Sequence, residues 1–204
     1  MNILSIIMFA IASSSDSLIV GLSYGAKKVK INFLNNLFIS SISGIGTLIA
    51  MLFGKVLLKF IPVQFSNILG SSILILFAVY LLFNFISKEI AQKKGIVEYQ
   101  LYDSALKNPE IIDTNNSKTI EMKESVMLGI VLCLNNIGLG IGASITGLNI
   151  IITSVSSLIF SLIFIPAGFY LGENIFTDKL SRYSEIISII IILLLGIYEL
   201  LSVK

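Results

Sequence analysis

Apolar stretches about as long as a membrane-spanning helix recur along most of this 204-residue chain. Six such spans are predicted, at residues 3–25, 33–53, 65–86, 125–146, 150–172 and 186–203. Lipid offers no hydrogen bonds to the backbone, and a helix satisfies its own backbone groups within one segment. The sequence therefore predicts an all-α, polytopic membrane protein with six transmembrane helices.

Composition excludes several other classes of protein. The net charge is only +2, and the lysines lie near the ends of apolar segments, so a nucleic-acid partner is not expected. The chain has no histidine, which removes the commonest transition-metal ligand, and its single cysteine, Cys133, cannot form an intrachain disulfide. No nucleophile–base pair, catalytic metal spacing or phosphate loop is found, so the sequence predicts neither an enzyme nor a covalent cofactor.

The first span carries a carboxylate, Asp16, in the middle of an uncharged segment. Such a group costs roughly 2.5–3.5 kcal/mol on insertion scales and is a functional-site candidate by default. A stripe of small side chains beside it, Ser17, Gly21 and Gly25, predicts close packing of another helix. The alternative is a protonated carboxyl that hydrogen-bonds Asn135 or a serine and only holds helices together.

The same pattern recurs in the fourth span, LGIVLCLNNIGLGIGAS at residues 128–144. There Asn136, Gly140 and Ser144 repeat the positions of the small-residue stripe, and Asn135 stands where Asp16 stood. Further counterparts are Gly54, Tyr80 and Leu82 in the first half and Gly172, Tyr198 and Leu200 in the second. Residues 1–86 and 125–204 are therefore predicted to be two three-helix repeats, unless repetitive aliphatic composition alone produces the similarity.

Three spans per repeat place the second copy in the membrane with inverted topology, an architecture found in transporters with a site near the midplane. Asp16, Asn135 and Asn136 are the predicted ligands of a divalent cation there, since carboxylate and amide oxygens are hard ligands. Amides also join helices without any ligand. Three other carboxylates, Glu173, Glu185 and Glu199, lie at or near span ends, where interfacial solvation explains them.

The basic residues predict how the chain is oriented. Eleven of them lie on one side, at positions 27, 28, 30, 88, 93, 94, 107, 118, 123, 179 and 182, and three lie on the other, at 55, 59 and 204. Because cytoplasmic segments carry the excess of Lys and Arg, both termini are expected outside the cell membrane. The polar segment 87–124 is then a cytoplasmic loop.

That loop contains the spacing of an EF-hand calcium site. Ligand positions one, three, five, seven and twelve would be filled by Asp113, Asn115, Ser117, Thr119 and Glu124. The sixth position, where the sharp turn favours glycine, is Lys118. Calcium binding and a degenerate relic of such a site are the two interpretations.

Three segments resemble a known family: SSSDSLIVGLSYGAKKVKI, ALKNPEIIDTNNSKTIEMKESVMLGIVL and NNIGLGIGASITGL. Together they resemble the sporulation membrane protein YtaF family, which is related to the MntP manganese efflux pumps. The resemblance implies a six-helix, two-repeat membrane protein with Mn²⁺ as candidate substrate. Asp16 matches the aspartate typical of the first repeat in that wider group, Asn135 replaces that of the second, and Lys118 replaces a common loop glycine.

The leading hypothesis is a divalent-cation efflux transporter of the manganese type. Two alternatives stay open. One is a sporulation membrane factor that transports nothing and acts through partner proteins or as a homo-oligomer. The other is a membrane protein that senses calcium through its loop. In each case the expected surroundings are membrane lipid.

Overall fold

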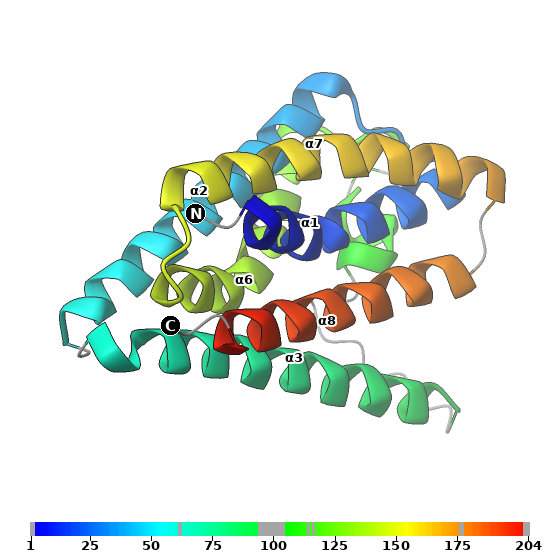
Figure 1. The fold of residues 1–204 in the computed structure, drawn as a ribbon. Coiled ribbons are helices and arrows are strands. Elements are labelled where there is room, and N and C mark those ends of the chain that lie inside the picture. Colours follow the sequence, from blue (N-terminus) through cyan, green and yellow to red (C-terminus); the bar gives the residue numbers. More distant parts are fainter. Residues whose placement is uncertain are drawn as a thin grey trace.

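The computed structural model describes residues 3–60, 63–93, 105–113, 115, 117–175 and 178–201. Its elements are α1 (Ile3–Ala26), α2 (Phe33–Leu57), the 3-10 turn η1 (Leu58–Phe60), α3 (Val63–Lys93), α5 (Pro109–Ile112), α6 (Met122–Ile145), α7 (Ile150–Ile175) and α8 (Asp178–Leu201). The described part of the chain holds six helices that are long and apolar enough to cross a membrane (Figure 1). The prediction of an all-helical chain with six candidate membrane-spanning helices is confirmed.

Two helices extend well beyond the predicted apolar spans. α3 continues to Lys93, and α8 begins at Asp178. The added residues are mostly polar and charged, and side chains such as lysine and glutamate favour helix as well as leucine does. Hydropathy marks the part of a helix that suits lipid, whereas it does not mark where the helix ends.

The six long helices pack in a regular set of pairs. The most extensive pairs are α1 with α7 and α2 with α6, and α3 runs beside α8 (Figure 1). α1 also contacts α8, α2 also contacts α7, α6 also contacts α3, and a smaller contact joins α1 to α6. α1 and α6 are therefore the two central helices: α1 packs against α6, α7 and α8 from the second half of the chain, and α6 packs against α1, α2 and α3 from the first half.

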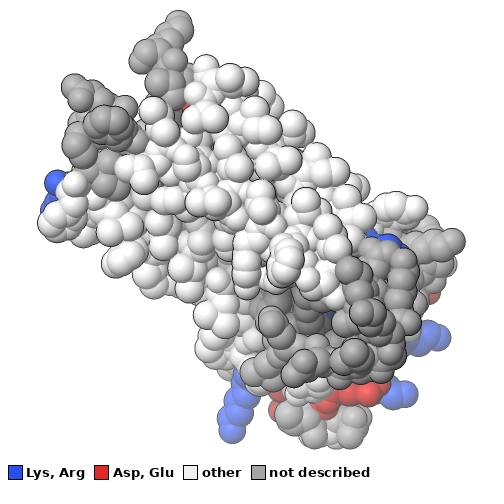
Figure 2. Space-filling model, turned by 90° about the horizontal axis from the view of Figure 1, so that it is seen from below, with Lys and Arg blue, Asp and Glu red and all other residues white. Residues whose placement is uncertain are grey.

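The outer surface between the two ends of the bundle is apolar. Exposed leucine, isoleucine and phenylalanine side chains are spread over all six long helices, among them Ile49, Leu76, Ile130, Ile163 and Leu194. On the face drawn in Figure 2 the body is uncharged, and the coloured charged residues lie toward its two ends. An apolar surface this continuous is a liability in water and suits contact with lipid.

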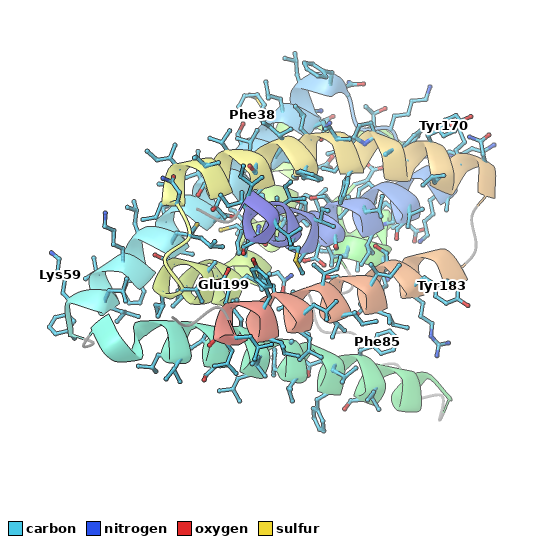
Figure 3. All side chains as sticks on the ribbon, viewed as in Figure 1. Phe38, Lys59, Phe85, Tyr170, Tyr183 and Glu199 are labelled. Carbon is cyan, nitrogen blue, oxygen red and sulfur yellow. The ribbon has the colours of Figure 1, made fainter. Side chains whose placement is uncertain are left out.

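One end of the bundle, called the loop end here, is where α1 and α7 end and where α2, α6 and α8 begin. Tyr170 and Tyr183 are exposed near this end, and Lys59 lies at the opposite end (Figure 3). Aromatic side chains with a polar tip are common at the edges of a bilayer. The guanidinium of Arg182 lies 5.9 Å from the centre of the Phe85 ring, which links α8 to α3.

The described part of the middle segment is packed onto the loop end. Tyr24 in α1 donates a hydrogen bond to the Ala105 carbonyl over 3.1 Å. Leu106, Ile112 and Ile120 are buried in one apolar cluster with residues of α1, α2 and α6. An isolated parallel bridge pairs Lys30 with Thr119. This part of the segment is therefore attached to the membrane helices.

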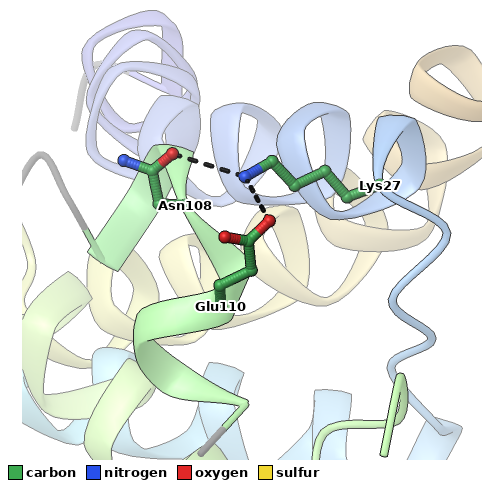
Figure 4. A network of polar contacts seen from close by, with 3 residues as sticks. All are labelled: Lys27, Asn108 and Glu110. Atoms are coloured by element: carbon green, nitrogen blue, oxygen red, sulfur yellow. Dashed lines mark hydrogen bonds and ion pairs between the residues drawn. The ribbon is translucent and has the colours of Figure 1, made fainter. Parts of the chain in front are cut away.

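A polar network ties the same segment to the end of α1. The Lys27 ammonium lies 3.0 Å from a carboxylate oxygen of Glu110 and 3.5 Å from the Asn108 side-chain oxygen (Figure 4). All three side chains lie at the surface, where such pairs contribute little to stability. The buried apolar contacts, and not this pair, fix the segment in place.

Candidate functional site

Asp16 and Asn135 meet where the two central helices touch. The Asn135 amide donates a hydrogen bond to Asp16 Oδ2 over 2.5 Å. Both residues are half-buried. A hydrogen bond to a carboxylate is strong, and an asparagine amide carries donors on its nitrogen and an acceptor on its oxygen. If it rotates, Asn135 can therefore present either an N–H to Asp16 or a carbonyl oxygen to a cation.

The pair lines a cavity of about 290 Å³, which we call the Asp16 cavity. Its walls come from α1, α3, α6, α8 and the two middle-segment residues Leu106 and Lys107. The polar wall residues are Asp16, Tyr80, Asn84, Lys107, Asn135, Glu185 and Ser188. Since a water molecule takes about 30 Å³ in the liquid, the cavity has room for an ion with several waters.

The cavity lies between the middle of the bundle and the loop end. Asp16 precedes the end of α1 at Ala26 by ten residues, which is about 15 Å along a helix. Glu185 lies in the second turn of α8, close to the loop end. On the other side of Asp16, Leu74, Ile192 and Leu195 are fully buried in a second apolar cluster. The cavity is thus bounded by tight packing toward the opposite end.

A second carboxylate and a lysine share this cavity with Asp16. Lys107 Nζ lies 3.4 Å from Glu185 Oε2, and the two side chains are 36% and 20% exposed. Lys107 comes from the middle segment and Glu185 from α8. Sequence reasoning assigned Glu185 to interfacial solvation because it precedes the predicted sixth span. No pattern in the sequence connects it with Asp16.

Asn136 faces elsewhere. It is fully buried, and its amide donates to Ser43 Oγ in α2 over 3.1 Å. Its side-chain oxygen has no hydrogen-bond partner. Neighbouring residues on a helix point about 100° apart, and Asn136 is not among the residues that line the Asp16 cavity. The structure brings Asp16 and Asn135 together, whereas a ligand role for Asn136 stays a prediction.

The small residues predicted for helix packing lie where helices touch. Ser17 and Ser161 hydrogen-bond through their hydroxyls over 2.7 Å between α1 and α7. A Cβ added to Gly21 would lie 2.3 Å from the Ile165 carbonyl oxygen, and one added to Gly25 would lie 2.2 Å from that of Phe169. Between α2 and α6, the corresponding Cβ on Gly140 would lie 2.8 Å from Ala50 Cβ, and Ser144 Cβ lies against Gly54.

The EF-hand-like segment adopts a compact turn. Lys118 has φ +58°, the left-handed conformation that glycine adopts without strain. Asp113 is buried, and its two carboxylate oxygens accept hydrogen bonds from the backbone N–H groups of Ser117 and Lys118. The Ser117 hydroxyl donates to the Thr119 carbonyl over 2.8 Å. Asn115 Oδ1 also accepts a hydrogen bond from the Ser117 N–H. The first four predicted ligand residues therefore belong to one hydrogen-bonded turn.

The twelfth position serves another purpose in this structure. Glu124 Oε2 accepts the backbone N–H of Glu121 over 2.9 Å, and the Glu121 side chain caps the N3 backbone in return. This capping box stabilises the start of α6. A calcium ion would require the Glu124 carboxylate to leave the cap.

Neither region contains a dense cluster of metal ligands. Among the described residues, no group of three or more cysteine, aspartate or glutamate side chains is arranged to hold a metal. A cation at either place would rely on one or two carboxylates together with amides, hydroxyls, carbonyls and water. Such oxygen ligands suit hard divalent cations.

Comparison with known proteins identifies the family. Residues 1–82 match the family described as "Putative manganese efflux pump". Over 200 aligned residues the chain is 34% identical to "Probable sporulation protein YtaF" of Bacillus subtilis (strain 168), covering 89% of this chain and 93% of that protein. The chain belongs to the YtaF family. No solved structure matches it.

The family assignment confirms the resemblance drawn from the three sequence segments. The family description that covers the first three long helices is that of a pump, which favours a transporter over an enzyme. That region contains Asp16 and much of the α3 wall of the Asp16 cavity. The cavity is therefore the candidate site of this YtaF-family chain.

Proposed function

We propose that this YtaF-family chain exports a divalent cation of the Mn²⁺ type through the Asp16 cavity. The observation that carries the proposal is the direct contact of Asp16 and Asn135 in a cavity within membrane-spanning helices. A carboxylate at this depth is costly, and such residues commonly mark an ion or substrate site. The family description supports Mn²⁺ as the candidate substrate.

The pair suits reversible binding of a cation. When the cavity holds no cation, the Asn135 N–H group stabilises the Asp16 carboxylate. A cation that binds Asp16 replaces this hydrogen bond, and the amide then turns its carbonyl oxygen toward the ion. Water supplies further ligands. The gain from the ion is offset by the loss of one strong hydrogen bond, which keeps binding weak enough for release.

We further propose that residues 1–86 and 125–204 are inverted repeats. Contacts between the helices support this, because three contacts on one side have a counterpart on the other. The hydrogen bond Ser17–Ser161 corresponds to Asn136–Ser43. The approach of Gly21 to the Ile165 carbonyl corresponds to that of Gly140 to the Thr47 carbonyl. The approach of Gly172 to the Leu22 carbonyl corresponds to that of Gly54 to the Ile141 carbonyl. Asp16 and Asn135 then face each other across the pseudo-twofold axis.

Inverted repeats provide a route for alternating access. The halves of α3 and α8 nearer the loop end line the cavity, whereas Leu74, Ile192 and Leu195 close the other side. If the closed half opened and the open half closed, Asp16 would become accessible from the opposite side of the membrane. The structure fits a state open toward the loop end.

We place the loop end in the cytoplasm. Lys27, Lys28, Lys30 and Lys118 lie there, and Lys55 and Lys59 lie at the other end, as the positive-inside rule requires. Several other basic residues used in the sequence-based count have side chains outside the described residues. In this orientation both termini are outside, and the cavity loads from the cytoplasm, as export needs.

Manganese resistance of an efflux-deficient bacterial host tests the function. Wild-type protein should protect, Asp16→Asn should abolish protection, and Asn135→Asp should increase it by restoring a second negative charge beside Asp16. Glu173→Gln, an exposed carboxylate outside the cavity, is the matched control. If wild type and Asn135→Asp both insert normally and neither protects, the transport function is wrong, and a non-transporting sporulation factor takes its place.

The middle segment supports a second candidate function, calcium sensing. The observation in its favour is the left-handed Lys118 at the position where an EF-hand loop has glycine. Lys118→Gly should tighten calcium binding, and Glu124→Gln should abolish it. Calorimetry on the full-length protein in detergent distinguishes this from a relic, for which no variant gives calcium heat.

A further inference from the structure

We propose that Glu185 is the second anionic group of the transport cavity and that Lys107 is a tethered cation, which the transported ion displaces from it. This inference rests on the proposed function of the Asp16 cavity. It assigns roles to two residues that lie outside the motif pair of the repeats. The observation behind it is that both side chains line the cavity of Asp16 and approach each other there.

The backbone that carries Lys107 is fixed, while its charged tip is adjustable. Ala105 and Leu106 are 0% and 2% exposed, and the Ala105 carbonyl accepts the hydrogen bond of the Tyr24 hydroxyl. Lys107 follows directly and extends a four-carbon stem into the cavity. Because the stem is flexible, the ammonium can leave without disturbing the buried residues before it.

The contact between the two charges is loose. Lys107 Nζ lies 3.4 Å from Glu185 Oε2, beyond the 2.7–2.9 Å typical of strong charged hydrogen bonds. Both side chains are partly exposed, so water screens the pair. An ammonium held in this way compensates the carboxylate but is easily replaced by an ion of higher charge.

Formal charges explain why replacement would accompany ion binding. The cavity holds the carboxylates of Asp16 and Glu185 and the ammonium of Lys107, a net charge of −1. A divalent cation together with both carboxylates is neutral only if the ammonium has left. If it stayed, its repulsion of the cation would be strong in a medium less polar than water. Asn135 is neutral at the position that corresponds to Asp16, and Glu185 supplies the second negative charge instead.

A purely structural ion pair makes a different prediction. In that case removing either partner breaks the same contact, so both variants should change transport in the same direction. As a displaced counter-cation, Lys107 should compete with the ion, and its removal should act opposite to that of Glu185. The sign of the two effects therefore separates the two roles.

The test is the dependence of transport on Mn²⁺ concentration in proteoliposomes containing the full-length protein. Lys107→Gln should lower the half-saturating Mn²⁺ concentration by about 3- to 10-fold, and Glu185→Gln should raise it by at least about 10-fold. The double variant should resemble Glu185→Gln. Lys27→Gln, which breaks the ion pair with Glu110 outside the cavity, is the matched control and should behave as wild type.

Glu185→Asp guards against a folding defect, since it keeps the charge and should recover most of the affinity lost in Glu185→Gln. If wild type transports and Glu185→Gln saturates at the same concentration, the inference is wrong and the proposed function stands. Equal shifts in the same direction for Lys107→Gln and Glu185→Gln overturn it as well. If wild type transports no divalent cation, the proposed function itself fails, and the inference fails with it.

Discussion

The contact between α1 and α7 and the contact between α2 and α6 use positions that correspond under the proposed repeat, with different side chains. Glycines meet backbone carbonyls in both, and a polar pair follows in both, Ser17 with Ser161 in one and Asn136 with Ser43 in the other. One step further along, the first contact has a second serine pair, Ser13 with Ser157. The second contact has buried Leu132 and Ile39 at the matching positions. Close backbone approach is therefore the shared feature, and the polar links are variable.

The two contacts also differ in tightness. A Cβ on Gly172 would lie 2.2 Å from the Leu22 carbonyl oxygen, whereas one on Gly54 would lie 2.8 Å from that of Ile141. Backbone atoms cannot move aside as a flexible side chain can. The α1–α7 contact thus leaves no room for a methyl group, and the α2–α6 contact leaves slightly more.

The largest expected effect is on the tight contact. Gly172→Ala should destabilise the protein by about 1–3 kcal/mol, the usual cost of overpacking, because α7 must shift away from α1. Gly54→Ala should cost less. Thermal unfolding in detergent should give midpoints in the order wild type, Gly54→Ala, Gly172→Ala. The reverse order would show that tightness does not distinguish the two contacts.

A smaller effect is expected where α1 and α6 end. Both helices end in equivalent turns, with Lys28 at φ +57° and Gly147 at φ +88°. The Val29 N–H bonds the Tyr24 carbonyl over 2.9 Å, and the Leu148 N–H bonds that of Ala143 over 3.2 Å. A side chain in this conformation costs about 1–2 kcal/mol.

Lys28→Gly should therefore stabilise the protein by about 0.5 kcal/mol after the extra freedom of glycine in the unfolded chain is subtracted. Gly147→Ala should destabilise it by about 1 kcal/mol, although no atom lies within 4 Å of the added Cβ. A higher unfolding midpoint for Lys28→Gly together with a lower one for Gly147→Ala would confirm that the two turns have the same conformational requirement. Movement of both midpoints in the same direction would contradict this.

The smallest effect is expected at the polar pairs. Hydrogen bonds between membrane helices contribute about 0.6 kcal/mol on average, so Ser17→Ala should cost no more than that. Asn136→Ser keeps a partner for Ser43 and removes the buried amide oxygen that has none, so its stability should match wild type. Transport should also be unchanged if Asn136 serves packing alone. Loss of Mn²⁺ transport in a stable Asn136→Ser protein would instead support the predicted ligand role.

Much of this architecture follows from sequence patterns. Apolar runs locate the six long helices, and the match of Asp16 with Asn135 anticipates the contact between the two central helices. Helix ends are less predictable, since α3 and α8 continue through polar residues that hydropathy excludes.

The wider site depends on tertiary structure that single-chain patterns do not record. Glu185 enters the cavity because α8 lies beside α1, and Lys107 enters because Ala105 and Leu106 before it are buried and Ala105 is hydrogen-bonded to Tyr24. Asn136 lies on a different face of α6 from Asn135 and contacts Ser43 in α2. Lys118 adopts a left-handed turn that its side chain alone does not predict.

The most direct test of the central claim is Mn²⁺ flux across proteoliposomes that contain wild-type protein or Asp16→Asn. The account predicts saturable flux for wild type, at least about 100-fold lower flux for Asp16→Asn, and flux above wild type for Asn135→Asp, with all three proteins equally folded. Equal flux for wild type and Asp16→Asn would contradict the claim that the Asp16 cavity carries the cation.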